Sequence, residues 1–300
     1  ARERETMSFN YVVTAHKPTN VTHSLTGNFT GPDELNLIVS KCTRIEVHRM
    51  DSEGLHCIMD VPLYGRVATM ELWRPAGARQ DSLFLTTERY QFCILAYDAA
   101  TGEIVTKAKG DVSDRIGRPT DSGQIALIDP QCQLIGLHLY DGLFKVIPAT
   151  PSGQLKSEAY NVRLEELQVL DACFLYNMPK PTLAFLYQDT KEMRHLKTYE
   201  VLLKDKDFGQ GPWSQSNIEA GASMLIPVTY GGVLVLGEHT ITHLSGVDFK
   251  SVPVPFSMFK AHGKIDNGRY LLADSNGLLS VLVLRIEGGA VAGLQLERLG

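Results

Sequence analysis

The chain has 300 residues, of which 44% are hydrophobic and 21% charged, and its formal net charge is −5. This balance is typical of a globular protein with a sizeable core, and the negative charge argues against direct nucleic-acid binding, which usually needs a basic face. No apolar run approaches the ~18 residues that would span a bilayer, so we expect no membrane partner.

The first predicted elements are a charged tail over residues 1–6 and a strand over Phe9–Thr14. From residue 35 onward one unit recurs, namely a short apolar strand, a polar turn and a second strand. The unit occurs over residues 35–48, 83–97, 134–147, 183–201, 233–244 and 270–284. Turn signals such as Asp141-Gly142 and Asn276-Gly277 close these hairpins.

The repeat predicts an all-β protein, and specifically a β-propeller. Five units recur about every 49 residues, which is room for four strands, or one propeller blade. The Gly-His…Trp-Asp signature of WD40 blades is missing, since neither Trp73 nor Trp213 precedes an Asp. The hairpins and the opening strand account for about six blades, whereas a seven-bladed ring would need roughly 340 residues. Because the sequence stops at Gly300 just after a strand-like run, we expect a fragment of a longer protein.

One segment, Asn161–Leu170, has helix-like spacing and good helix formers. It lies between two hairpins, where the array calls for a strand pair. Helix propensity is a weak guide against a periodic array, so we favour strands.

Cofactor and metal motifs are missing from the sequence. The five cysteines form no Cys-x-x-Cys pair and their odd number suits a reducing compartment, although two Asn-x-Ser/Thr sequons, at Asn20 and Asn28, oppose this. His239 and His243 would lie about 13 Å apart along a strand, too far to share one metal ion. We therefore predict no cofactor, no metal and no catalytic residue. The alternative is a propeller glycosidase, with carboxylates from at least two blades in the channel.

The segment Lys107–Pro119 is the candidate interaction loop, because it combines four basic side chains with two glycines and a proline. Arg115 and Arg118 are the candidate protein-interaction residues, since a guanidinium can bind a partner carboxylate through two hydrogen bonds. The alternative is a solvated loop in which Arg115 pairs with Asp111 or Asp114.

Several strings resemble a known family, that of the large subunit of the UV-damaged-DNA-binding complex. They are Met7–Thr19, Asp114–Pro119, Ile128–Cys132, Gly136–Pro148 and Asn161–Leu167. The resemblance runs in order from residue 7 to residue 300.

The resemblance implies a protein with three seven-bladed propellers that is the adaptor of cullin-4 RING ubiquitin ligases in the nucleus and cytoplasm. Its first and third propellers grip WD-type substrate receptors, and its second binds the cullin. Residues 7–300 would then be an incomplete first propeller, without enzymatic activity or the cullin site. DNA would be reached only through a damage-recognising partner subunit. Related subunits of splicing factor 3b and of the cleavage and polyadenylation factor are the alternative. The resemblance assigns no site residue to this stretch, so Arg115 and Arg118 rest on loop chemistry alone.

Overall fold

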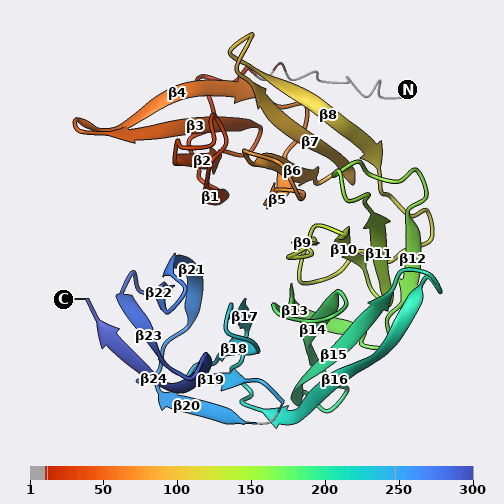
Figure 1. Cartoon of the computed structure of the whole chain (residues 1–300), viewed down its shortest axis with the longest axis vertical. Coiled ribbons are helices and arrows are strands. Elements are labelled where there is room, and N and C mark those ends of the chain that lie inside the picture. The colour runs from red at the N-terminus through yellow and green to blue at the C-terminus, as the bar shows by residue number, and fades with distance from the viewer. Residues whose placement is uncertain (1–10, 12, 247, 300) are drawn as a thin grey trace, which may run out of the picture.

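The computed structural model describes residues 11, 13–246 and 248–299, and these residues form 24 strands and no helix. The strands make six four-stranded antiparallel sheets, each built from four consecutive strands. Figure 1 shows the sheets arranged around a common centre, with the first strand of each sheet innermost and the fourth at the rim. The chain is therefore a propeller with six blades, as the hairpin repeat predicts. The blades form an open arc whose two ends are the first and sixth blades (Figure 1).

The strand bounds follow the blades in chain order. The first two blades contain β1 (His23–Gly27), β2 (Asn36–Ser40), β3 (Arg44–Asp51), β4 (Gly54–Pro62), β5 (Val67–Trp73), β6 (Ser82–Thr87), β7 (Gln91–Asp98) and β8 (Glu103–Asp111). The third and fourth contain β9 (Ile125–Ile128), β10 (Leu134–Tyr140), β11 (Leu143–Pro148), β12 (Tyr160–Arg163), β13 (Gln168–Phe174), β14 (Thr182–Gln188), β15 (Arg194–Leu202) and β16 (Asp207–Ile218). The fifth and sixth contain β17 (Met224–Pro227), β18 (Val233–Leu236), β19 (Thr240–Leu244), β20 (Phe249–Pro253), β21 (Phe259–Asp266), β22 (Arg269–Asp274), β23 (Leu279–Glu287) and β24 (Ala290–Arg298).

Each predicted hairpin is the second and third strand of a blade. These strands lie in the middle of a sheet that is covered on both faces, so they consist of near-continuous apolar runs. Every residue of β10 and β18 is buried, for example. Positive φ angles at Gly142 and Gly277 allow the tight turns that close two of the hairpins.

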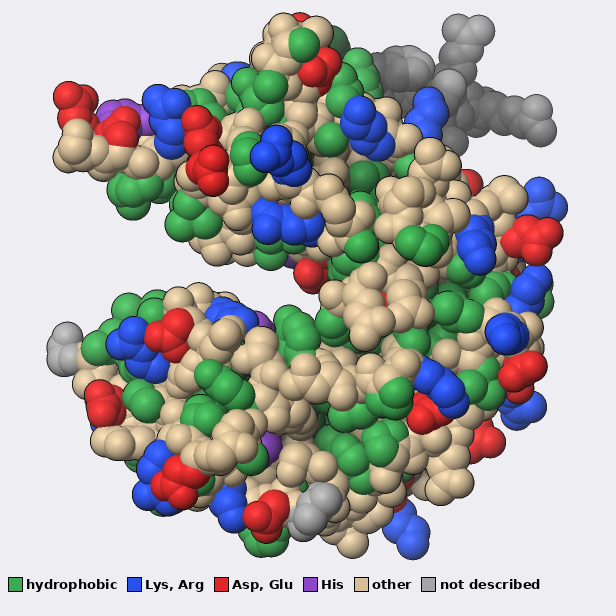
Figure 2. Space-filling model, in the orientation of Figure 1, with side chains coloured by type: hydrophobic (Ala, Val, Ile, Leu, Met, Phe, Trp, Pro, Cys, Tyr) green, Lys and Arg blue, Asp and Glu red, His purple; other side chains and the backbone are tan. Residues whose placement is uncertain are grey.

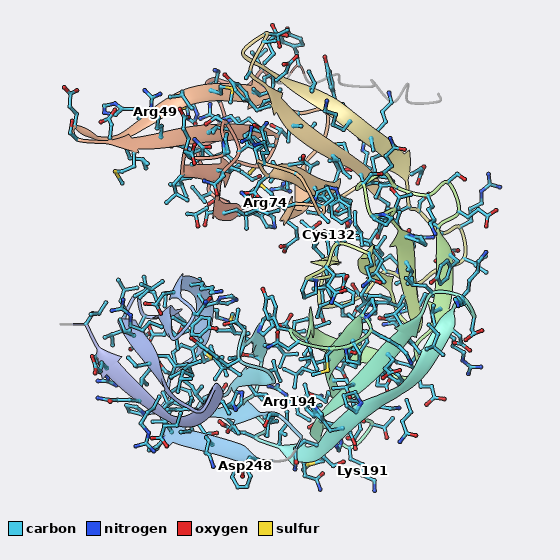
Figure 3. All side chains as sticks on the ribbon, in the orientation of Figure 1. Arg49, Arg74, Cys132, Lys191, Arg194 and Asp248 are labelled. Carbon is cyan, nitrogen blue, oxygen red and sulfur yellow. The ribbon has the colours of Figure 1, made fainter. Side chains whose placement is uncertain are left out.

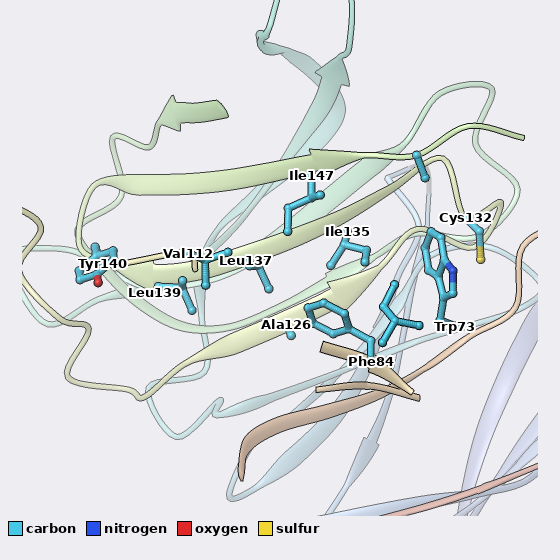
Figure 4. Close-up of a cluster of buried hydrophobic side chains, with 12 residues drawn as sticks. Trp73, Phe84, Val112, Ala126, Cys132, Ile135, Leu137, Leu139, Tyr140 and Ile147 are labelled. Carbon is cyan, nitrogen blue, oxygen red and sulfur yellow. The ribbon is translucent and has the colours of Figure 1, made fainter. Parts of the chain in front are cut away.

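The core is divided into five clusters, each shared by two neighbouring blades. Figure 4 shows the cluster between the second and third blades, where Trp73 and Phe84 of one blade pack near Ile135 of the next. All three side chains are at most 2% exposed. Burial of apolar surface at these interfaces is thus the main force that holds one blade to the next.

Polar contacts also join the blades near the channel. The Asp81 carboxylate of the second blade accepts a hydrogen bond from the Asn28 amide of the first at 2.6 Å. Asp171 of the fourth blade accepts one from the Leu225 amide of the fifth at 2.7 Å. These bonds satisfy backbone amides in or next to the inner strands, and so they fix how adjacent blades meet.

The start of the first blade differs from the prediction. Among the described residues the innermost strand of the first blade is β1, whereas the sequence predicts a first strand over Phe9–Thr14. Residues 9, 10 and 12 of that predicted strand lie outside the described residues, and its described residues Tyr11, Val13 and Thr14 are not in a strand. The predicted tail over residues 1–6, and with it the boundary at residue 7, also lies outside the described part.

Two other segments, Asn161–Leu170 and Lys107–Pro119, contain parts of strands. Asn161–Leu170 forms the end of β12, a short turn and the start of β13, so the strand interpretation is confirmed. The lysines and glycine of Lys107–Asp111 predict a loop, but this prediction is wrong, because these residues form the end of β8. Lys107 and Lys109 are exposed, whereas Ala108 between them packs against the core. Gly110 leaves room for the Phe92 ring, because a Cβ at this position would lie 2.6 Å from it. Among the described residues no helix is long and apolar enough to cross a membrane.

Candidate protein-docking face

The inner strands of all six blades line a central channel with a cavity of about 760 Å³. Its titratable lining includes His23, Glu71, Asp171 and His262. Burial lowers the pKa of both histidines, so their imidazoles are neutral at pH 7. The channel lining therefore carries carboxyl groups and neutral imidazoles, together with the guanidinium of Arg74.

Three carboxyl groups line the channel, and they differ in their partners. Asp129 accepts the Gln133 amide at 3.0 Å. Burial raises the pKa of Asp171 to about 6 despite backbone hydrogen bonds from Leu225 and Ala172. One oxygen accepts the Ala172 amide at 2.8 Å and the other the Leu225 amide, so this side chain joins blades. Burial alone raises the pKa of Glu71 to about 7, and no described residue donates it a hydrogen bond or an ion pair. Glycoside hydrolysis uses a pair of working carboxyl groups, whereas here Asp171 and Asp129 both accept backbone amides.

Glu71→Gln should make the stability of the protein less dependent on pH. Because the pKa of Glu71 is higher in the folded than in the unfolded chain, protonation stabilises the fold. The contribution is complete below about pH 4.5 and is lost as the pH rises through about 7. The variant should therefore be about 1–3 kcal/mol more stable than the native protein at pH 8 and equal to it near pH 4.5. Urea unfolding at both pH values measures this, and an equal difference at the two would contradict the assignment.

A second hollow lies on what we call the connecting-loop face. This face carries the connections from the last strand of one blade to the first strand of the next, together with the turns between second and third strands. A cavity of about 500 Å³ opens there between the first three blades. Its lining comprises Thr22, His23, Arg66, Val67, Ala68, Glu88, Tyr90, Pro119, Thr120, Gly123, Gln124 and Leu139.

The candidate loop borders this hollow and is firmly attached to the third blade. The Asp114 amide donates to the Tyr140 hydroxyl at 3.0 Å, and Pro119 makes a β-bridge with Tyr140. The Tyr140 ring stacks on Tyr90 with centroids 5.0 Å apart. At Gly117 a Cβ would lie 2.6 Å from the Tyr140 ring, so the glycine permits this close contact. A loop held in this way presents its exposed side chains in a fixed geometry, which lowers the entropy cost of binding a partner.

The structure places Arg115 and Arg118 on this loop but in different surroundings. Arg118 is 74% exposed and pairs with Asp121 at 3.5 Å and with Asp141 at 3.4 Å. Arg115 is exposed and has no ion pair with a described residue. Neither of the carboxylates considered for it pairs with it: Asp111 accepts the Ser113 amide, and Asp114 accepts the Ile116 amide. Ile116, between the two arginines, is 94% exposed.

Several residues of the face and channel were not predicted from the sequence. Tyr90 and Arg66 come from the second blade and its entry loop, and they reach the candidate loop only through the stacking of blades. Glu71 and Asp171 lie inside otherwise apolar strands, and a single carboxylate in such a strand can be recognised in the sequence. That signal, an acidic residue in an otherwise apolar run, would have marked both as channel residues.

These features define a scaffold-type β-propeller, with apolar cores between its blades and its accessible polar groups on one loop face and in a channel. The family described as the RSE1/DDB1/CPSF1 first β-propeller matches residues 20–300, and the chain belongs to this family.

Among relatives, the chain is 62% identical over 296 residues to DNA damage-binding protein 1 of Solanum lycopersicum, covering 97% of this chain. It is 60% identical to DNA damage-binding protein 1a of Arabidopsis thaliana over 297 residues, 98% of this chain, and 60% identical to DNA damage-binding protein 1 of Oryza sativa subsp. japonica, over 97% of this chain. The expected resemblance is thereby confirmed. The chain spans 27% of the length of each of these relatives.

Proposed function

We propose that this chain is a receptor-binding propeller of an adaptor subunit of cullin-4 RING ubiquitin ligases, linked to the repair of UV-damaged DNA. Cullin-4 would bind through a different propeller of the whole protein, and DNA would be reached through a damage-recognising partner subunit. The protein would act in the nucleus and the cytoplasm, and without catalysis of its own.

The observation that carries this proposal is the 62% identity, across nearly the whole chain, to proteins named DNA damage-binding protein 1. The geometry supports it in two ways. The blades are joined by apolar cores and polar contacts, which suits a rigid platform, and the connecting-loop face presents a hollow bordered by a fixed, exposed loop. The net charge of −5 supports indirect rather than direct contact with DNA.

The test is affinity purification of the full-length parent protein from its own cells. We expect cullin-4 and WD-type receptor proteins in the eluate, and fluorescence of the tagged protein in both nucleus and cytoplasm. Recovery of splicing factor 3b or of cleavage and polyadenylation factors, without cullin-4, would overturn the proposal and assign the protein to the other branch of the family.

Arg115→Glu should weaken receptor binding about tenfold, because it reverses an unpaired charge on the connecting-loop face. Arg118→Glu should weaken it as well, since it also places a carboxylate beside Asp121 and Asp141. Calorimetric titration of the parent protein with a purified receptor measures both. The matched control is Arg285→Glu, a reversal at a 71% exposed arginine of the sixth blade, which should leave affinity unchanged. Native affinity in both loop variants would remove these arginines from the site.

A further inference from the structure

Three metal-ligating side chains of different chemistry meet on the outer half of the first blade. Glu46 and His48 are two residues apart on β3 and so project from the same face of the sheet. Cys57 of β4 is the cross-strand partner of His48, at a register shift between the two strands. One ligand atom from each lies within 4.8 Å of the other two, and this is the one such group found among the described residues.

The group is close to the dimensions of a tetrahedral zinc site. Zinc binds nitrogen and oxygen at about 2.0–2.1 Å and sulfur at about 2.3 Å, so two N/O ligands lie about 3.3 Å apart and sulfur lies about 3.5 Å from either. The His48 Nε2 and Glu46 Oε2 atoms are 3.1 Å apart, which is close to the distance expected between two such ligands. The Cys57 thiol is exposed and donates to the Met59 carbonyl oxygen at 3.3 Å. Because Cys57 is exposed, its side chain has room to rotate about the Cα–Cβ bond, and this rotation is the movement that would bring the sulfur to the third corner of the tetrahedron.

Two neighbouring cations set how tightly a metal can bind. Lys41 Nζ is 2.7 Å from Glu46 Oε2, and Arg44 pairs with the other oxygen. A metal ion would displace the ammonium of Lys41, which is on a flexible stem, while Arg44 keeps its own oxygen. Zinc with one thiolate and one carboxylate is neutral overall, so the remaining repulsion is modest, but it makes the site weaker than a four-ligand structural site.

We propose that Glu46, His48 and Cys57 form a three-ligand zinc site with an open fourth position on β3 and β4. The mixed sulfur, nitrogen and oxygen set suits zinc or cobalt and is unsuited to magnesium or calcium, which require oxygen ligands. The site lies on the long outer hairpin of the first blade, next to Arg49, which is labelled in Figure 3. A bound ion would join the two strands of that hairpin. This site is independent of the adaptor function proposed above.

The test is a titration of the reduced, full-length protein with cobalt(II), followed by visible and near-ultraviolet absorption. We expect intense tetrahedral d–d bands together with a thiolate-to-cobalt charge-transfer band, and both should saturate when this site has bound one equivalent of cobalt(II). Both should be lost when zinc(II) is added. Cys57→Ser should abolish the charge-transfer band. His48→Gln should raise the dissociation constant at least tenfold, and it provides a second route if the cysteine variant folds poorly. Magnesium should not compete.

The matched control is Cys42→Ser, which removes another cysteine of the same blade outside the group and should leave the spectrum unchanged. Absence of a charge-transfer band in the native protein would overturn the proposal. So would a band that survives both Cys57→Ser and His48→Gln, because the metal would then be bound elsewhere.

Discussion

Phe144→Ala should lower the free energy of unfolding by about 3–5 kcal/mol, the loss typical of removing a fully buried ring. Phe144 is 0% exposed at the junction of the third and fourth blades, and its ring lies 5.5 Å from that of Phe185 and 5.7 Å from that of Phe208. The ring also fills the space over Gly136, where a Cβ would lie 2.5 Å from it. Its neighbours are held by two different sheets and cannot close around the resulting cavity, which places the loss in the upper range.

Denaturant unfolding of the parent protein, monitored by circular dichroism, measures this effect. Phe249→Ala is the matched control, because Phe249 is 69% exposed and its truncation should cost less than about 1 kcal/mol. A similar loss in the two variants would show that the blade junction is not the source of stability.

Asp81→Ala should cost about 2–4 kcal/mol, since it leaves partly buried donors without an acceptor. Asp81 is 5% exposed. Its carboxylate accepts the Asn28 amide at 2.6 Å and binds the Arg74 guanidinium at 2.7 Å and 2.9 Å. Its removal takes this acceptor from the Asn28 amide and leaves Arg74 with its hydrogen bond to Asn28 Oδ1 at 3.0 Å, which loosens the contact between the first and second blades. Asp81→Asn keeps one oxygen acceptor, so it should lose less.

The same unfolding measurement separates this contact from an ordinary surface ion pair. Asp121 is 82% exposed on its side chain and 3.5 Å from Arg118, so Asp121→Ala should change stability by less than about 0.5 kcal/mol. If Asp81→Ala cost no more than Asp121→Ala, the contact between blades would not contribute to the fold.

The central hairpins could be predicted from the sequence because their surroundings leave a strong pattern. Val233–Leu236 is an unbroken apolar run because both of its faces are covered, and turn residues mark its end. The outer strands leave no such pattern. β16 contains two glycines and Pro212, which is typical of a loop, and its strand form depends on pairing with β15 through two register shifts.

The candidate site was predictable in composition but not in geometry. Lys107–Pro119 could be selected because basic side chains, glycines and a proline occur together. The pairing of Arg118 with Asp141 involves the turn of a different hairpin, and it depends on how the loop lies against the third blade. Likewise Cys57 lies nine residues beyond His48 in the sequence, and the strand register is needed to place them together.

The division of the core into five separate clusters has a mechanical consequence. Each interface is shared by two adjacent blades, so a displacement of one blade is transmitted stepwise to its neighbours, as in linear repeat proteins. Small changes of angle at successive interfaces would add up along the series of six blades, which Figure 2 shows in space-filling form. The orientation of any one blade relative to a distant one is therefore set jointly by all the interfaces between them and by no single hinge.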